Sequence, residues 1–160
     1  MRKLLSERTN MIAVLQRVSK ASVSVDGEIV GKCGKGLAIL LGVAGGDCEK
    51  DAEVLAEKIS KLRIFSDEND KMNLSVMDID GEALVVSNFT LLANYAHGNR
   101  PDYMGAAKPD EANRLYEYFC LLLGKKVRSV EKGVFGADMA LEISNDGPVT
   151  IVMDSKILIK

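Results

Sequence analysis

A glycine-bounded apolar run at residues 36–43 is the feature that most constrains the fold of this chain. It reads GLAILLGV and carries no polar side chain on either face of an extended strand. Because successive side chains of a strand point to opposite faces of a sheet, such a run is stable only where both faces are buried. It therefore predicts a strand at the centre of a sheet.

Alternating runs nearer the N-terminus predict a strand followed by a hairpin. Residues 12–18 are apolar and rich in β-branched side chains, and Arg17 lies near the far end of this strand. Residues 22–25 and 28–30 alternate on either side of Asp26-Gly27. A two-residue loop of this composition supplies the positive φ angles of a type I′ turn. We expect an antiparallel hairpin here.

The same turn signal recurs later in the chain. Asp80-Gly81 separates residues 74–77 from the apolar run 82–87, so we expect a second hairpin. Residues 126–130, 139–144 and 149–153 are predicted to be the closing strands.

Two amphipathic segments predict helices. Asp47 is a candidate N-cap for a helix over residues 49–62, with apolar residues on one stripe. Pro109 suits the first position of a helix that continues over residues 110–123 and stops at Gly124. The rest of the chain is rich in strands.

The segment NDGPVT at residues 145–150 lies between the last two predicted strands. Pro148 brings no backbone donor and Gly147 has no side chain to pack, so the pair suits a strand poorly. A hairpin turn is the ordinary interpretation. A rigid backbone device in a binding site, with a cis peptide bond, is the alternative. The pattern alone leaves both open.

The size of the chain fits one domain. It has 160 residues, a mass of 17.4 kDa and 47% hydrophobic residues, enough for one continuous core. We expect a single α/β domain over residues 11–160, mostly antiparallel with two main helices, and interpret residues 1–10 as an N-terminal extension or tag. The net charge of -2 and pI of about 5.5 exclude a general basic nucleic-acid coat, so a nucleic acid would be bound locally.

The reactive side chains are few. Three cysteines form no CxxC pair, which argues against a disulfide framework or zinc ribbon and favours a reducing cytoplasm. The single histidine cannot build the usual zinc constellations within one subunit, and no phosphate-binding glycine loop opens a helix. No apolar run approaches the roughly 18 residues of a membrane helix. We expect a cytoplasmic protein without a metal, a cofactor or a membrane partner.

The end of the predicted strand at residues 82–87 is the first candidate site. Ser87, Asn88 and Thr90 surround Phe89 there, and sites are often built on strand ends and the loops after them. The loop at residues 93–107 is long enough to have a functional use. It holds His97, so a triad of Ser87 or Thr90 with this histidine is arithmetically possible, although a lone loop histidine more often faces solvent.

Several segments together resemble the D-aminoacyl-tRNA deacylase (D-tyrosyl-tRNA deacylase) family. SNFTL at residues 87–91 and NDGPVT at residues 145–150 occur in the order typical of that family. LQRV at 15–18, GNRPD at 98–102 and GVFGADM at 133–139 are also similar, so the resemblance spans residues 11–153. One departure is Asn88, where the family usually has a glutamine with one more methylene.

The resemblance implies a barrel-like fold and a hydrolase of the ester that joins a D-amino acid to the terminal adenosine of tRNA, with removal of glycine as well. It implies a homodimer with sites at the subunit interface. A cis Gly147-Pro148 bond would enter the partner subunit's pocket, with Arg17 holding it.

By the same carry-over, Ser87, Asn88, Phe89 and Thr90 form the catalytic segment beside the ester. Phe89 and Met139 would shelter the terminal adenine of the aminoacyl-tRNA 3′ end. Two mechanisms stay open: Thr90 as nucleophile, or backbone groups assisted by the 2′-hydroxyl of the tRNA. In the second, the N–H groups of Phe89 and Thr90 are predicted to stabilise the oxyanion.

Two other functions fit parts of the sequence. A non-catalytic nucleic-acid or protein-binding module on the same fold would use a basic strip of Lys125, Lys126, Arg128 and Lys132, although a solvated strand edge also explains it. An ordinary esterase would use Ser87 and His97.

Overall fold

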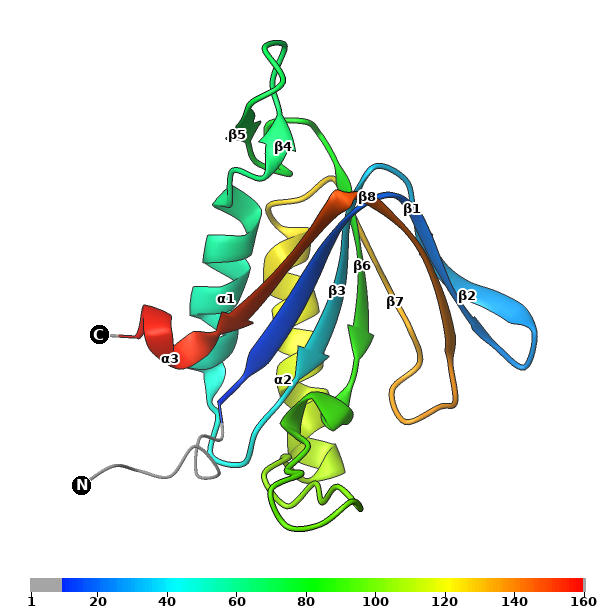
Figure 1. Cartoon of the computed structure of the whole chain (residues 1–160), viewed down its shortest axis with the longest axis vertical. Helices are drawn as coiled ribbons and strands as arrows, with labels where there is room; N and C mark the ends of the chain where they lie inside the picture. Colours follow the sequence, from blue (N-terminus) through cyan, green and yellow to red (C-terminus); the bar gives the residue numbers. More distant parts are fainter. Residues whose placement is uncertain (1–9, 160) are drawn as a thin grey trace.

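The computed structural model describes residues 10–159, which form one mixed α/β domain (Figure 1). Of the predicted N-terminal extension, only Asn10 falls within the described residues. The elements, in chain order, are β1 (Ile12–Val25), β2 (Glu28–Cys33), β3 (Gly36–Gly42), α1 (Glu49–Lys61), β4 (Phe65–Ser66), β5 (Met72–Leu74), β6 (Glu82–Ser87), the 3₁₀ helix η2 (Phe89–Leu92), α2 (Pro109–Gly124), β7 (Ser129–Lys132), β8 (Ala140–Asp154) and α3 (Ser155–Leu158).

The main sheet has six strands in the order β2-β1-β3-β6-β7, with β8 paired to β1. The first half of β1 pairs with β3, its second half pairs with β2, and β8 runs antiparallel along its other edge. This exchange of partners curls the sheet into the barrel-like form that the resemblance implies (Figure 1). The prediction of a central strand is confirmed, because β3 lies between β1 and β6 and six of its seven residues are buried.

The first predicted hairpin is confirmed and the second is wrong. Asp26 and Gly27 have φ angles of 50° and 82°, and β1 pairs antiparallel with β2 across them. Asp80-Gly81 instead ends an irregular turn in which Gly81 N–H donates to Val76 O. Strand β6 pairs parallel to β3 and to β7, while β5 pairs with β4. The apolar run of β6 needs partners on both edges and cover on both faces, which a two-stranded hairpin does not provide.

The two main helices are confirmed, with one correction at a cap. Helix α2 begins at Pro109 and ends at Gly124 as predicted. Helix α1 is capped by Cys48 and not by Asp47, because the Asp51 carboxylate accepts from Cys48 N–H at 2.9 Å. Asp47 Oδ2 accepts from Ala44 N–H instead. The strand predicted over residues 126–130 begins only at Ser129, because the N–H groups of residues 126 and 127 still bond to the last turn of α2.

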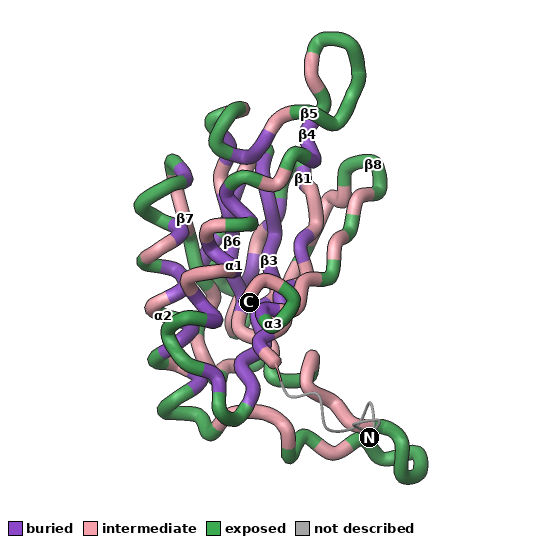
Figure 2. Tube along the Cα trace, turned by 90° about the vertical axis from the view of Figure 1, so that its left-hand side faces the viewer, coloured by how far each residue is buried: buried purple, intermediate pink, exposed green. Residues whose placement is uncertain are grey.

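Side chains of β3 alternate between two cores. In Figure 2 the trace of β3 is coloured mostly as buried. Leu37, Ile39 and Leu41 face the layer of helices α1 and α2. Ala38 packs on the opposite face of the sheet, which the curled strands β2 and β8 cover. The glycine-bounded run is therefore buried on both sides, as its composition requires. No helix among residues 10–159 is long and apolar enough to cross a membrane.

Residues 140–154 form one strand, so the hairpin interpretation of NDGPVT is wrong. Both halves of β8 pair with β1 in the same direction, Val18 with Asn145 and Gln16 with Thr150. Between these two pairs the chain advances by two residues along β1 but by five along β8. The extra residues of β8 form a bulge opposite Arg17. The Gly147-Pro148 peptide in this bulge is cis. A bulge accommodates proline in a strand because the bulged residues are not needed in the ladder.

A buried carboxylate ties α3 to the start of α1. Asp51 is fully buried, and its Oδ1 accepts from Ser155 Oγ and Lys156 Nζ, each at 2.6 Å. Burial alone would raise the pKa of Asp51, but the hydrogen bonds from Lys156 and Ser155 hold it below its usual value. The nearby Asp47 accepts no hydrogen bond on Oδ1 from any residue in the range 10–159, and Lys156 Nζ lies 3.9 Å from that oxygen. Burial raises the pKa of Asp47 from 3.8 to about 6.

The raised pKa of Asp47 predicts a pH dependence of stability. Its folded state favours the neutral acid, so stability contributed by this group is present below about pH 4 and is lost as the pH rises to about 6. In the Asp47→Asn variant this loss of stability with rising pH should be absent. The control Asp26→Asn, at an exposed turn, should keep the wild-type dependence of stability on pH. Denaturant unfolding at several pH values between 4 and 7 measures it. Identical profiles for the wild type and Asp47→Asn would contradict the prediction.

Candidate active site

Close packing on Gly42 sets the position of the SNFTL segment. Strand β6 ends at Ser87, and Asn88 N–H donates to Leu41 O at 2.9 Å, so η2 starts directly beside the end of β3. A Cβ on Gly42 would lie 2.6 Å from Leu92 Cδ2 and 3.1 Å from Asn88 O. Only a residue without a side chain lets η2 sit this close to the sheet.

The Asn88 amide organises the polar groups of this segment. Its Oδ1 accepts from Thr90 N–H at 3.3 Å and from the Thr90 hydroxyl, which makes Asn88 the N-cap of η2. The Thr90 proton is therefore held by a neutral amide. Of the two N–H groups predicted to face an oxyanion, that of Thr90 is engaged, while that of Phe89 has no partner among residues 10–159.

A cavity of about 850 Å³ opens beside η2. The residues that line it include Ser87, Asn88, Phe89, Thr90 and Met139. The structure thus brings together all four residues of the predicted catalytic segment and, with Phe89 and Met139, both of the predicted adenine contacts. The half-exposed ring of Phe89 and the aromatic residues around it offer the apolar surface on which a base can stack.

Sequence reasoning assigned no role to two aromatic residues of this cavity. Tyr103 packs edge-on against Phe89, with ring centroids 5.0 Å apart and planes at 78°. Phe135 lies in the loop before β8 and also lines the cavity. The long loop at 93–107 holds two tyrosines, Tyr95 and Tyr103, and the sequence alone does not distinguish them; only the fold brings Tyr103 to η2.

Arg17, Gly147 and Pro148 lie away from this cavity. Arg17 pairs with Leu37 and Ser87 pairs with Leu41, so they are four residues apart along β3, about 13 Å at the usual rise of a strand. Figure 1 shows the bulge of β8 and the tip of β6 at opposite ends of the sheet. Within one protomer, the structure therefore keeps the two motifs of the sequence apart.

The bulge is nevertheless firmly held. Arg17 donates from Nε to Asp146 O at 3.1 Å and from Nη1 to Ile64 O at 2.9 Å. Asn145 Nδ2 donates to Arg17 O and to Val149 O, which closes the bulge at its base. Gly147 has a φ of 127°, and a Cβ there would meet Arg17 Nη2 at 2.9 Å. Arg17 thus bonds to Asp146, the residue before Gly147, while Gly147 and Pro148 stay exposed.

The remaining candidates are not assembled into a site. His97 is exposed on its loop, does not line the cavity and makes no hydrogen bond to Ser87 or Thr90. In the described part of the chain, no three His, Cys, Asp or Glu side chains are close enough to hold a metal ion together. The geometry supports binding of an aromatic base beside a polar segment in which the Phe89 N–H has no partner among residues 10–159.

Comparison with known proteins identifies the class. A model of the D-Tyr-tRNA(Tyr) deacylase family matches residues 14–154, so the chain belongs to this family. A relative from Caldicellulosiruptor saccharolyticus, named D-aminoacyl-tRNA deacylase, is 58% identical over 146 residues that cover 91% of this chain and 98% of the relative.

Two solved structures share the fold. A protein described as c-Myc DNA Unwinding Element Binding Protein has a TM-score of 0.85 and 42% identity, covering 89% of this chain and 97% of the other. A probable eukaryotic D-amino acid tRNA deacylase has a TM-score of 0.79 at 15% identity, covering 91% and 99%, which shows likeness of fold alone.

Gly42→Ala should destabilise the protein by about 1–3 kcal/mol, because the added methyl group forces η2 away from β3. Gly45→Ala is the matched control, since its Cβ would meet only Gly105 O at 3.8 Å, an ordinary contact. Denaturant unfolding of both variants measures the difference. Equal free energies of unfolding would show that η2 does not depend on this contact.

Proposed function

We propose that this chain hydrolyses the ester bond of D-aminoacyl-tRNA, and of mischarged glycyl-tRNA, to release the free amino acid and tRNA in the cytoplasm. Its family and its relatives support this activity. The observation that carries the proposal is the aromatic-lined cavity beside the SNFTL segment, while the equally well-held Gly147-Pro148 bulge lies at the other end of the protomer.

The separation of the two motifs supports a homodimer in which each cavity is completed by the partner subunit. Gly147 and Pro148 are exposed and fixed by Arg17, so they are ready to contact a second chain. Beside them on β8, Thr150 is exposed and Val152 is 70% exposed. An exposed apolar side chain on a strand, such as that of Val152, is suited to burial between two copies of the chain.

A backbone wall explains selection of the D form. A pocket that merely lacks a favourable contact discriminates by about 1–3 kcal/mol, whereas a thousandfold preference requires about 4 kcal/mol. Gly147 and the Pro148 ring are held rigid by Arg17 and Asn145. Steric exclusion by these two residues supplies the larger free-energy difference between the D and L forms. An L side chain would collide with this wall. A D-amino acid and glycine both present a hydrogen there and are admitted.

Hydrolysis needs a polarised carbonyl and a water. The Phe89 N–H has no partner among residues 10–159 and is the proposed donor to the oxyanion, a contribution of about 2.7–4 kcal/mol for one donor in precedents. Water attacks the carbonyl carbon, the ester C–O bond breaks, and the 3′ oxygen of the terminal ribose takes up a proton. The adjacent 2′-hydroxyl of the substrate is the group nearest to assist this transfer. Thr90 positions the segment and does not attack.

A deacylation assay with D-Tyr-tRNA, L-Tyr-tRNA and Gly-tRNA tests the activity. We expect rapid release from the first and third, with kcat/KM for D-Tyr-tRNA about a thousandfold or more above that for L-Tyr-tRNA. Hydrolysis of the L form at a comparable rate would contradict the steric wall, and hydrolysis of none would contradict the proposed function.

Thr90→Ala separates positioning from nucleophilic attack. Because the Thr90 hydroxyl donates to the Asn88 amide and no base contacts it, we expect kcat to fall by about tenfold or less. Thr90→Ser, which keeps the hydroxyl, serves as the control. A covalent acyl-enzyme on Thr90 in quenched reactions, or a loss of several thousandfold in Thr90→Ala alone, would overturn this assignment.

Nucleic-acid binding without catalysis is the second candidate, favoured by the 42% identical structure described as a DNA unwinding element binding protein. The strip predicted to serve it is largely neutralised, since Lys126, Arg128 and Lys132 form ion pairs with Glu57, Glu82 and Glu117. Tight, steeply salt-dependent binding to duplex DNA without deacylation would favour this candidate.

A further inference from the structure

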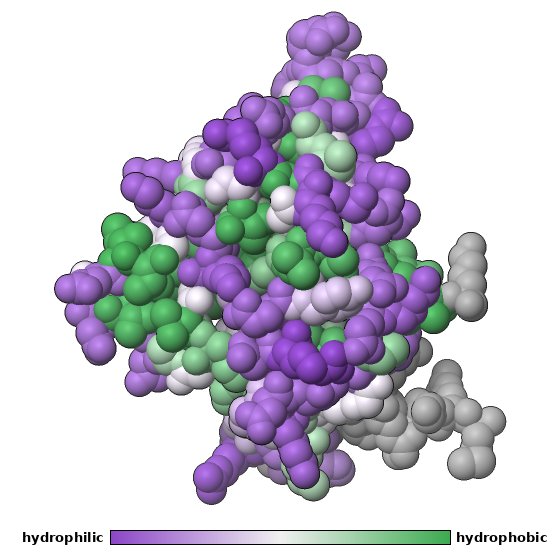
Figure 3. All heavy atoms as spheres, turned by 180° about the vertical axis from the view of Figure 1, so that it is seen from behind, coloured by the Kyte–Doolittle hydropathy of each residue, from purple (hydrophilic) through white to green (hydrophobic). Residues whose placement is uncertain are grey.

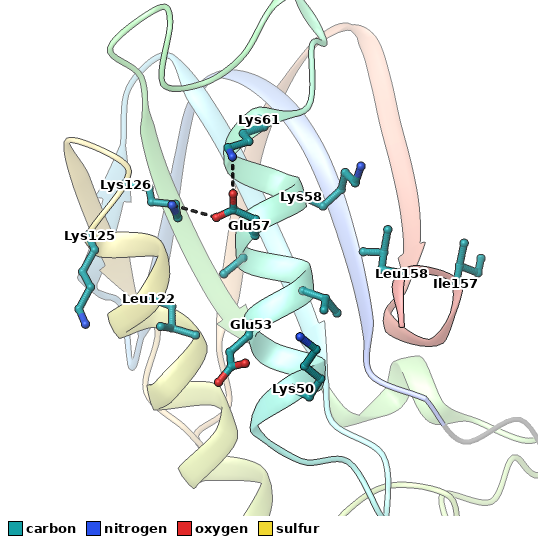
Figure 4. Close-up of a pocket in the computed structure, with 12 residues that line it drawn as sticks. Lys50, Glu53, Glu57, Lys58, Lys61, Leu122, Lys125, Lys126, Ile157 and Leu158 are labelled. Atoms are coloured by element: carbon teal, nitrogen blue, oxygen red, sulfur yellow. Dashed lines mark ion pairs between the residues drawn. The ribbon is translucent and has the colours of Figure 1, made fainter. Parts of the chain in front are cut away.

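A second hollow lies on the outer side of the helix layer, far from η2. It is a groove of about 770 Å³ over α1, bordered by the end of α2 and by α3 (Figure 4). The side of the molecule opposite to that of Figure 1 is mostly hydrophilic, with smaller apolar areas between the hydrophilic side chains (Figure 3). The charged residues of the groove are Lys50, Lys58, Lys61, Lys125, Lys126, Glu53 and Glu57.

The groove has an excess of positive charge in a chain whose net charge is -2. Glu57 binds both Lys61 and Lys126, and these hydrogen bonds lower its pKa to about 2, so it stays anionic. Two of the five lysines therefore share one carboxylate.

The other three lysines are free to bind an anion. Lys50, Lys58 and Lys125 have no ion pair or side-chain hydrogen bond to any residue in the range 10–159. Figure 4 shows Lys125 on the α2 side of the groove, and Lys50 and Lys58 along α1. The two lysines of α1 are eight residues apart, about 12 Å along the helix axis. An extended polyanion matches this spacing better than a single small anion does.

The groove adjoins the proposed substrate wall. Helix α1 ends at Lys61, and three residues later Ile64 O accepts from Arg17, the side chain that also holds Asp146 beside Gly147. Under the proposed function, this wall borders the 3′-terminal aminoacyl-adenosine in the partner subunit's cavity. The nucleotides that precede this terminal adenosine in the tRNA extend away from the wall, and they then come within reach of the end of α1.

We propose that this groove binds the phosphate backbone of the acceptor end of a tRNA whose 3′ terminus occupies the partner subunit's cavity. An RNA duplex is a dense polyanion, and lysines that neutralise its phosphates gain free energy by releasing counterions. The lysines contact phosphates only and therefore read no sequence. The inference rests on the proposed function, because that function supplies the position of the 3′ end.

Lys58→Glu/Lys125→Glu tests the groove without touching the cavity. We expect KM for D-Tyr-tRNA to rise about tenfold or more at 0.15 M salt, with kcat unchanged. The slope of log KM against log salt should fall by about 1.4–1.8, the value for two lost phosphate contacts. Hydrolysis of D-Tyr-adenosine, which has no phosphate backbone, should be unchanged. Binding of uncharged tRNA by fluorescence anisotropy should weaken by a similar factor.

The charge-matched control is Lys20→Glu/Lys32→Glu, which reverses two exposed lysines on β1 and β2. It should keep the wild-type KM for D-Tyr-tRNA. Equal values for the two double variants would overturn the proposal and identify the groove as an ordinary solvated lysine face. An equal loss with D-Tyr-adenosine would also overturn it, because the effect would then arise in the cavity.

The two proposals fail in different ways. If the wild type hydrolyses no D-aminoacyl ester, the proposed function fails whatever the lysines do. If the wild type hydrolyses D-Tyr-tRNA and the groove variant binds uncharged tRNA as tightly as the wild type, only the groove assignment fails.

Discussion

The pairing capacity of β1 is the constraint on which the rest of the structure depends. One edge of this strand bonds to β8, and the other edge is divided between β3 and β2. A strand that changes partners along its length has to bend the sheet, because each pairing brings its own twist. The bend encloses the smaller core between β3 and the curled strands. It also directs the ends of β3 and β6 toward the loops that line the cavity.

The same pairing explains the bulge of β8. The ladder resumes on both sides of Asn145–Thr150, so the extra residues are expelled opposite Arg17 while the strand continues. Arg17 occupies the position at which the ladder is interrupted. Its guanidinium donates to the backbone oxygen of Asp146 in the bulge and to that of Ile64, three residues after the end of α1. A planar group with several donors is suited to such a bridge, which a lysine could not reproduce. One side chain thereby connects the proposed wall, the sheet and the end of the basic groove.

The site depends on backbone and amide groups more than on titratable side chains. Asn88 accepts from both the N–H and the hydroxyl of Thr90, Gly42 determines how close η2 comes, and the Phe89 N–H has no partner among residues 10–159. A shorter amide than the usual glutamine fits this role, because an asparagine at an N-cap reaches the N–H two residues ahead. The scarcity of catalytic side chains in the sequence is thus consistent with a site in which geometry is fixed by the main chain.

Local signals in the sequence by themselves determined the central strand, the Asp26-Gly27 turn and helix α2 from Pro109 to Gly124. Each follows from the burial pattern or φ preference of neighbouring residues. The resemblance carried by SNFTL and NDGPVT also indicated the family. Only the tertiary structure decided that β6 runs parallel to β3, that β8 is continuous, and that Cys48 rather than Asp47 is the N-cap of α1. It alone placed the two motifs at opposite ends of the protomer. These outcomes depend on which distant strand accepts each hydrogen bond and on which N–H each carboxylate accepts from, and spacing along the chain does not encode such contacts.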